Sequence, residues 1–390
     1  MLCNLSFKLW ALIRDHAKIK AQSTKFKKAN PGKSLKRGGL FYTQKGMFDS
    51  PSTLDYASVV SSVANLSQEG FSTAMPPTSE SGFIGIELSE SKLRAATVNH
   101  EGVVGERREA KLHPDGLVGQ VAQLVSDLRQ NTNGVAAVGI AIPGLVNRQT
   151  DRVLASRDLP GIVRGNLHAE LMEATGLRFE LENDANAAAY GEFKIGAGRG
   201  SRDLFYITIG QGIGGAIILD GKLWTGASGL AGEVGHITID TEGAECECGN
   251  TGCLETVASA PNIVRRANER LHRDGTSSLS RLAMNKDFTA DDLAREAKEG
   301  DDFSLMMIER TGKYIGTGVA SIINLLNIER IVLGGGVMQA GDLILNPIIQ
   351  EAKRRAFLPC FEATQIVVAA LGEDAATIGA AMLARDAEIN

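Results

Sequence analysis

Four residues in one short segment have the spacing of a zinc site. His236 precedes Cys246, Cys248 and Cys253, with nine, one and four residues in the intervals. Three thiolates and one imidazole form closed tetrahedral sites of the structural kind, in which no coordination position is left for a substrate. The chain has five cysteines in all and no clear secretory signal, so close clustering favours a metal over disulfides. The segment therefore predicts structural zinc that braces a loop.

A second segment places an acid and amides where a predicted strand meets an Ala-rich helix. Asp184 stands between Asn183 and Asn186 at this junction. A carboxylate at the cleft-facing end of a strand can accept a proton from a substrate hydroxyl, and amides suit a polyol because they both donate and accept hydrogen bonds. The local alternative is helix capping, since Asp and Asn are expected before a helix on structural grounds alone.

A third segment is a glycine-rich turn. Gly210, Gln211, Gly212 and Gly214 connect two predicted strands. Backbone amides in such a turn can cradle phosphate, although a plain glycine hairpin has the same composition. A strand rather than a helix follows the turn, which excludes a dinucleotide-binding fingerprint.

Strands and helices alternate in two rounds along the rest of the chain. The strands that we expect lie at 83–88, 93–98, 103–106, 135–142, 179–182, 204–209, 214–219, 237–240, 331–333 and 365–369. The helices that we expect lie at 117–128, 167–174, 185–193, 260–271, 290–298, 303–326, 341–355 and 374–385. This order is typical of two α/β lobes with similar wiring, whose ligands bind beyond the strand ends in the cleft between the lobes.

Over roughly three hundred residues from Gly82 onward, the chain resembles the ROK family of sugar kinases and sugar-sensing repressors. The segments that carry the resemblance are Ala141-Ile142-Pro143-Gly144, Leu159-Pro160-Gly161, Glu182 to Gly191, Gly226-x2-Gly229-x2-Gly232-Glu233-x-Gly235-His236, Cys246 to Glu255, Leu333-Gly334-Gly335-Gly336-Val337 and Gly372-Glu373-Asp374-Ala375-x3-Gly379-Ala380. The resemblance implies an α/β fold of the actin-like, hexokinase-like (ribonuclease H-like) type, with two lobes of duplicated topology. We expect a small lobe at 83–200, joined by a C-terminal helix at 373–390, and a large lobe at 201–372 that carries the zinc loop.

The resemblance also implies the roles of individual residues. In the family, the Asp at the position of Asp184 is the general base that deprotonates the primary hydroxyl of the sugar. The positions implied to bind sugar are Asn183, Asp158, Glu233, His236 and Glu255. His236 would then serve zinc through one ring nitrogen and the sugar through the other. The positions implied to bind ATP are Lys92, Gly210, Gln211, Gly212, Gly214, Gly335 and Gly336.

The implied activity is ATP- and Mg²⁺-dependent phosphorylation of the 6-hydroxyl of a hexose, glucose or a near relative. In-line phosphoryl transfer needs positioning and charge neutralisation more than covalent help. The partners implied are hexose, ATP and a second copy of the chain in a homodimer.

One segment departs from the family pattern. Family kinases begin with a hairpin of the form Asp-x-Gly-Gly-Thr-Lys, whereas this chain has Glu87-Leu88-Ser89-Glu90-Ser91-Lys92. Glu90 adds bulk and like charge where a γ-phosphate should approach. Similar departures occur in the repressors of the family, which leaves a sugar-sensing regulator and a non-catalytic sugar-binding protein as alternatives. A repressor should carry an N-terminal winged helix-turn-helix, and residues 1–82 show no apolar three-helix pattern, so we favour the kinase.

The composition of the chain excludes some classes of protein. Hydrophobic residues make up 43% of the chain and no run of 18 apolar residues occurs, which excludes a transmembrane helix and a chain disordered throughout. Residues 1–82 hold 11 Lys and Arg against 5 Asp and Glu and are expected to be a disordered extension, with a transit peptide, a nucleic-acid or lipid contact, or a true start at Met47 as alternatives. The acidic remainder is a poor nucleic-acid surface, and we expect a cytoplasmic protein without a membrane partner.

Overall fold

The computed structural model describes residues 82–113, 115–130, 134–148, 150–271, 276–284 and 287–389. The expectation of a disordered extension therefore lies outside the described residues, apart from Gly82 at its end. Among the helices described, none is both long and apolar enough to cross a membrane.

The first sheet has five strands in the order β3-β2-β1-β4-β7. These strands are β1 (Gly82–Leu88), β2 (Lys92–Val98), β3 (Val104–Lys111), β4 (Val135–Ile142) and β7 (Arg178–Asn183). The first three are antiparallel neighbours, whereas β4 and β7 run parallel to β1. The carboxyl ends of the three parallel strands therefore lie at one edge of the sheet, where ligands of α/β sheets bind.

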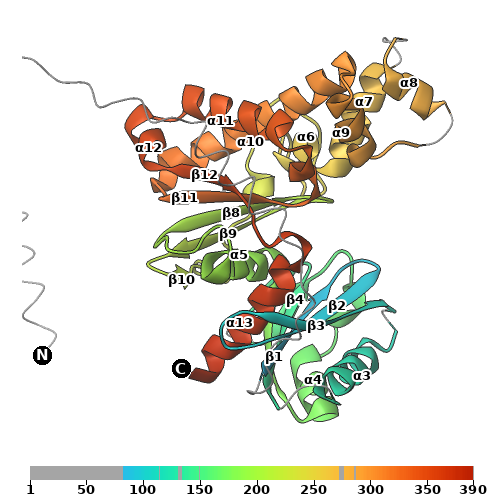
Figure 1. Cartoon of the computed structure of the whole chain (residues 1–390), viewed down its shortest axis with the longest axis vertical. Coiled ribbons are helices and arrows are strands. Elements are labelled where there is room, and N and C mark those ends of the chain that lie inside the picture. Colours follow the sequence, from blue (N-terminus) through green and yellow to red (C-terminus); the bar gives the residue numbers. More distant parts are fainter. Residues whose placement is uncertain are drawn as a thin grey trace, which may run out of the picture. The chain divides into compact units, whose positions relative to one another are not determined.

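The second sheet repeats this arrangement in the order β10-β9-β8-β11-β12. Its strands are β8 (Leu204–Ile209), β9 (Ile213–Leu219), β10 (Lys222–Leu223), β11 (Arg330–Gly334) and β12 (Gln365–Val368). Three antiparallel strands are again followed by two parallel ones, which is the duplicated topology that the sequence predicts. The lobes that we propose at 83–200 with 373–390 and at 201–372 each contain one of these sheets (Figure 1).

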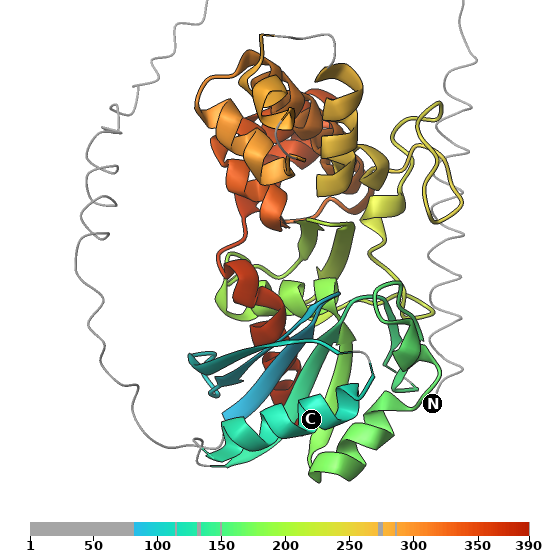
Figure 2. The ribbon, with the colours of Figure 1, turned by 90° about the vertical axis from the view of Figure 1, so that its right-hand side faces the viewer.

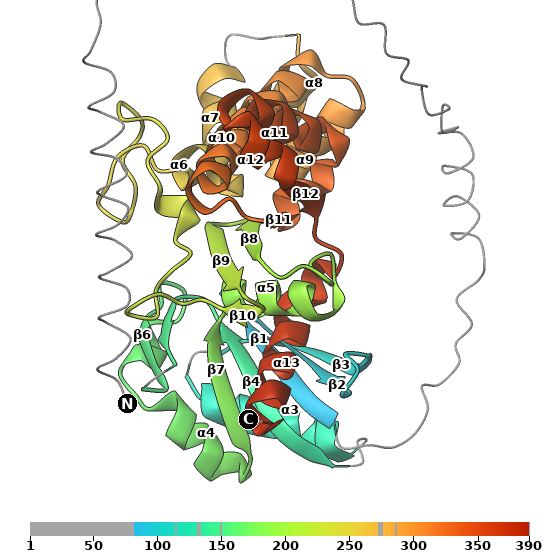
Figure 3. The same ribbon diagram turned by 90° about the vertical axis from the view of Figure 1, so that its left-hand side faces the viewer.

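Helices connect and cover the two sheets (Figures 1 and 3). The α-helices are α3 (Leu117–Gln130), α4 (Leu167–Thr175), α5 (Asp184–Ile195), α6 (Glu255–Ala258), α7 (Ala260–Leu271), α8 (Ser278–Ala283), α9 (Ala290–Lys298), α10 (Asp302–Leu326), α11 (Asp342–Arg355), α12 (Leu358–Ala363) and α13 (Ala375–Ile389). Short 3₁₀ segments are η2 (Pro160–Val163), η3 (Val234–His236), η4 (Gly336–Ala340) and η5 (Gly372–Asp374).

Helices α5 and α13 lie between the two sheets and share one buried cluster with strands of both (Figure 3). Alanine dominates this cluster, and α13 approaches β4 so closely that a Cβ built on Gly139 would lie 1.9 Å from the carbonyl oxygen of Ala380. Small residues are required at such contacts because the backbone of the neighbouring element occupies the space that a larger side chain would need.

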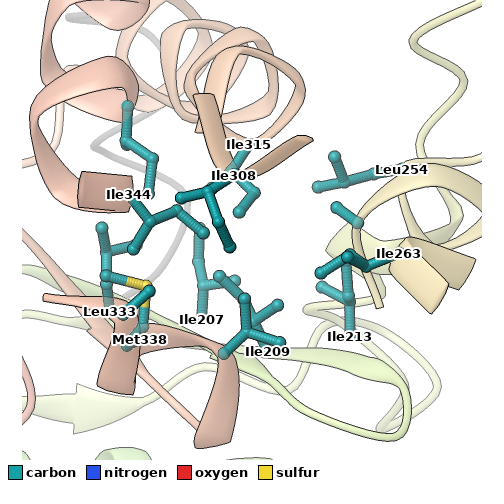
Figure 4. Packing of buried hydrophobic residues seen from close by; sticks show 14 of the residues in the cluster. Ile207, Ile209, Ile213, Leu254, Ile263, Ile308, Ile315, Leu333, Met338 and Ile344 are labelled. Carbon is teal, nitrogen blue, oxygen red and sulfur yellow. The ribbon is translucent and has the colours of Figure 1, made fainter. Parts of the chain in front are cut away.

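Branched apolar side chains fill the core of the large lobe. Ile207 and Ile209 of β8 pack against Ile308 and Ile315 of α10 (Figure 4). All four are at most 2% exposed, so each adds roughly 1.5–3 kcal/mol of burial relative to an exposed position. This core supports the strand that ends at the glycine turn.

Two expected strands differ from the structure, and several short elements, among them β10, α6, α8 and α12, were not predicted. Residues 237–240 form no strand; Thr238 makes only an isolated bridge with Cys253, because the chain reverses within the cysteine segment. Strand β3 extends to Lys111, five residues beyond the predicted end, since its exposed edge residues lack the apolar alternation that marks a strand. A small hairpin of β5 (Leu145–Asn147) and β6 (Arg152–Ala155) was not predicted.

Candidate active site

Asp184 is the first residue of α5 and directly follows β7. The preceding Asn183 is the N-cap, and its side-chain oxygen accepts from the backbone N–H of Asn186 at 3.0 Å. The Nδ2 group of Asn183 donates both to the carbonyl oxygen of Gly144 and to Asp184 Oδ1, each at 2.9 Å. The capping alternative is therefore realised by Asn183, and Asp184 remains a candidate base.

The environment of Asp184 favours its neutral form. Burial raises the pKa of Asp184 from 3.8 to about 6, and the nearby Asp158 carboxylate adds to this rise. Hydrogen bonds from Ala185 N–H and Asn183 stabilise the charged form and oppose the shift. A carboxylate poised near pH 6 is well matched to accept a proton at neutral pH.

Asp184 lines a cavity of ≈410 Å³ together with three groups of residues. The first sheet contributes Glu87 and Arg94, and η5 contributes Glu373. Gly334 at the end of β11 and the two glycines that follow it, Gly335 and Gly336, complete these groups. The predicted base and two of the predicted ATP-binding glycines thus share one cavity. Arg94 and Glu373 were not predicted, although the register of the β1–β2 hairpin places Arg94 directly opposite Glu87.

Glu87 has one oxygen without a hydrogen-bond partner inside this cavity. Its Oε2 atom is buried, and the nearest cation, Arg94 Nη1, is 3.8 Å away. Burial raises the pKa of Glu87 to about 7; Arg94 opposes the rise, whereas the Asp184 carboxylate adds to it. An unpartnered carboxylate oxygen next to a second acid is the type of ligand that Mg²⁺ prefers.

Gly335 has a backbone conformation that excludes side chains. Its φ is +89°, and a Cβ atom there would lie 2.3 Å from the carbonyl oxygen of Ile209. The neighbouring Gly336 faces open space. The segment after β11 therefore crosses directly over the end of β8, where it lines the cavity.

The other predicted ATP-binding residues do not line this cavity. Lys92 forms an ion pair with Glu109 of β3 at 2.8 Å instead. The turn of Gly210, Gln211, Gly212 and Gly214 adjoins the cavity without lining it: Gly214 pairs with Thr208, and a Cβ on Gly214 would meet the side chain of Ala185 at 2.9 Å. The Glu255 carboxylate accepts from the N–H of Ile213 in this turn at 2.7 Å.

The predicted zinc ligands converge. The ligand atoms of His236, Cys246, Cys248 and Cys253 all lie within 4.8 Å of one another. The Sγ atoms of Cys248 and Cys253 are 3.7 Å apart and His236 Nδ1 is 3.6 Å from Cys246 Sγ. Tetrahedral zinc with Zn–S bonds of about 2.3 Å requires sulfur atoms about 3.8 Å apart, so the donor set fits the ion.

The segment that carries these ligands is an extended loop between η3 and α6, drawn in yellow (Figures 2 and 3). A tight turn at Gly252, with φ of +71°, brings the backbone against Asp240. Glu255 begins α6 two residues after the last cysteine. The ligand cluster and Glu255 are therefore held by one short stretch of chain.

Pairwise interactions link several of the predicted sugar-binding residues. His236 Nε2, the nitrogen that does not face the thiols, is 3.9 Å from the Glu233 carboxylate. Burial raises the pKa of Glu233. The charge of His236 opposes this rise in pKa, and the Glu255 carboxylate adds to it. Asp158 is held at 3.0 Å by Arg157, and Arg157 also contacts Glu247 between two of the cysteines at 3.1 Å. Arg157 and Glu247 were not predicted, and a pair so distant in sequence has no local signal.

Residues 83–387 match the family model described as ROK family. The chain belongs to the ROK family. A glucokinase of Halalkalibacterium halodurans is 34% identical over 330 residues, which are 80% of this chain and 97% of the relative. The solved structure of a ROK family glucokinase from Streptomyces griseus in complex with glucose and AMPPNP is 32% identical, with a TM-score of 0.69 over 78% of this chain and 99% of that chain.

Regulators of the ROK family are also similar to this chain. A xylose repressor of Caldicellulosiruptor bescii is 31% identical over 76% of this chain and 76% of the repressor. The predicted fold class is confirmed, since this ROK chain shares the fold of ROK glucokinase and hexokinase structures. Family membership alone does not separate sugar kinases from sugar-responsive repressors.

Proposed function

We propose that this ROK protein transfers the γ-phosphoryl group of ATP to the 6-hydroxyl of a hexose, with glucose as the first candidate. The observation that carries the proposal is that Asp184 lines one cavity with Glu87 and the Gly334–Gly336 segment. An acid with a pKa of about 6 would then be available to act at the edge of a cavity that we assign to the nucleotide. The glucokinase relatives support the same reaction.

The sugar would bind on the side of Asp184 that faces the zinc cluster. Asp158, Asn183, Glu233, His236 and Glu255 supply carboxylate, amide and imidazole groups for its hydroxyls. Charge interactions between Asp158 and Asp184, and between Glu255 and Glu233, support their close approach. Carboxylates that accept from neighbouring hydroxyls fix the ring and present one hydroxyl to the base.

Asp184 would act as general base in the transfer. The hydroxyl oxygen forms a bond to the γ-phosphorus, the bond from that phosphorus to the β–γ bridging oxygen breaks, and the hydroxyl proton passes to Asp184. Bound Mg²⁺ would neutralise charge on the phosphate oxygens. Glu87, with its buried unpartnered oxygen, is the residue that would hold the ion.

Zinc bound by His236 and the three cysteines would have a structural role, since four protein ligands leave no open position. The ion would fix His236 and, through the following helix, Glu255 at the sugar. Gly335 and Gly336 would contact the adenosine, and the turn of Gly210 to Gly214 the phosphates.

A sugar-sensing regulator is the second candidate. The specific observation in its favour is the first hairpin, where Ser89 and Glu90 replace two glycines of the kinase pattern. Coverage favours the kinase, because this chain matches 97% of the length of the glucokinase and 76% of the xylose repressor.

A coupled assay of ADP release over a panel of hexoses and N-acetylhexosamines tests the proposal. The kinase proposal expects turnover with at least one hexose that depends on Mg²⁺ and ATP. No turnover with any sugar, together with measurable sugar binding, would favour the sensor. Sugar-dependent DNA binding by the full chain, in a gel-shift assay, would favour the repressor class specifically.

A further inference from the structure

Arg94 is the one basic residue among the described residues that line the cavity of Asp184. It lies on β2, directly opposite Glu87 on β1. Glu87, Asp184 and Glu373 also line the cavity, so carboxylates outnumber the single guanidinium. A nucleotide that enters adds further negative charge, and a cation on the protein is needed to offset the repulsion.

Lys92, the residue that the family pattern points to, is directed elsewhere. Its Nζ atom is paired with Glu109 at 2.8 Å and it does not line the cavity. Lys92 and Arg94 are two residues apart on one strand, so their side chains leave the same face of the sheet. Arg94, in contrast, lines the cavity together with Asp184, and its side chain is 28% exposed.

The partners of Arg94 are carboxylates that a phosphate can replace. Its Nη2 contacts Glu373 Oε2 at 2.8 Å, its Nε contacts Glu109 Oε2 at 3.3 Å and its Nη1 is 3.8 Å from Glu87 Oε2. Glu373 and Glu109 are 74% and 51% exposed, and ion pairs with exposed carboxylates are weak. The third carboxylate, Glu87, makes no hydrogen bond to Arg94 through its Oε2 atom, which is 3.8 Å from Nη1.

The guanidinium group of Arg94 is chemically suited to phosphate. Guanidinium presents a planar fork of N–H donors that matches two oxygens of a phosphate group. The hairpin has Ser89 and Glu90 in place of the two glycines of the kinase pattern, so side chains hinder the contact of phosphates with its backbone amides. A cation at residue 94, five residues after Ser89, can restore that contact from the adjoining strand.

We propose that Arg94 binds the phosphate groups of the nucleotide in this cavity, exchanging its contacts with Glu373 and Glu109 for phosphate oxygens. The inference rests on the proposed function, since it assigns the cavity to a nucleotide. It makes Arg94 a binding residue for the ligand phosphates and not a support for the cavity wall.

Calorimetric titration of the full chain with two ligands, MgADP and adenosine, separates these roles. Arg94→Ala should weaken MgADP binding by roughly tenfold or more and leave adenosine binding within about twofold. Arg94→Lys should retain part of the MgADP affinity, because it keeps the charge and loses the fork. Arg107→Ala is the matched control. Arg107 lies on the neighbouring strand β3, contacts Asp374 of η5 at 2.8 Å and does not line the cavity, so both affinities should stay unchanged.

Two results would overturn the inference while the kinase proposal stands. In one, Arg94→Ala binds MgADP as the parent chain does. In the other, it loses MgADP and adenosine affinity equally, which is the result of a collapsed wall. A parent chain that binds no MgADP would overturn the kinase proposal and this inference together, and circular dichroism of each variant identifies any loss of folding.

Discussion

The Glu255 carboxylate accepts a 2.7 Å hydrogen bond from the backbone N–H of Ile213. This bond joins the first residue after the zinc loop to the glycine turn that follows β8. The loop and the turn are far apart in sequence, so we expect a change at the four candidate zinc ligands to affect the turn through the Glu255 side chain.

Replacing a zinc ligand should affect the sugar pocket as well as the metal. We expect Cys248→Ser to lose bound zinc and to weaken glucose binding by roughly tenfold, because Glu255 and His236 lose their support. Elemental analysis and calorimetry measure the two effects. Cys360→Ser, a cysteine outside the cluster, should keep its metal; undiminished zinc in Cys248→Ser would remove that residue from the ligand set.

Two adjacent glycines in the cavity wall should tolerate alanine very differently. Gly335→Ala forces a side chain into φ of +89° and against the backbone of Ile209, and it should lower stability by about 1–3 kcal/mol or more. Gly336→Ala meets open space and should be near neutral. Thermal melts of the two variants check the difference, and equal melting temperatures would contradict the close approach of the two segments.

The elevated pKa of Glu87 predicts how stability depends on pH. Between pH 4.5 and about 7 the folded chain holds a proton on Glu87 that the unfolded chain releases, so stability should fall as pH rises through this window. Glu87→Gln resembles the neutral acid, so the stability of this variant should fall less as the pH rises. Urea denaturation at pH 5 and pH 7.5 measures the free energy of unfolding of both chains.

The exposed Glu109 on β3, which also contacts Arg94, provides the comparison for Glu87. Glu109→Gln should leave the fall in stability in place. If Glu87→Gln and the parent chain lose stability in parallel over the window, Glu87 is charged in the folded chain and the account of its burial is wrong.

The pKa of Asp184 predicts the pH dependence of turnover. Only the ionised carboxylate can accept the hydroxyl proton, so kcat/KM for the sugar should rise about tenfold per pH unit below about pH 6 and level off above it. Initial rates from pH 5 to pH 8, with stability checked at each pH, provide the profile. A flat profile from pH 5 to pH 7 would exclude a base with this pKa.

Local signals in the sequence account for much of the fold and part of the candidate site. The repeated strand order follows from strands that alternate with amphipathic helices, and the four predicted metal ligands do converge in space. Asp184 could be placed at a strand end because the β7–α5 junction is continuous in sequence. Its role as a base stays a prediction.

Contacts between distant segments could not be predicted. Lys92 pairs with Glu109 of β3 and does not line the cavity, and the exposed, polar residues of β3 hid the length of that strand. Arg94 entered no motif, since its relation to Glu87 depends on the hairpin register. Residues 237–240 look like a strand in sequence, but the cysteine loop leaves Thr238 with only one bridge partner.

The central claim is that this chain is a sugar kinase with Asp184 as its base, and Asp184→Asn tests it most directly. The side chain keeps its size and still accepts from Asn183 and Ala185, so sugar affinity measured by calorimetry should stay within a few-fold of the parent chain. ADP release with glucose should fall by roughly 10²–10⁴-fold. A parent chain that turns over glucose alongside an Asp184→Asn variant of equal kcat would contradict the account.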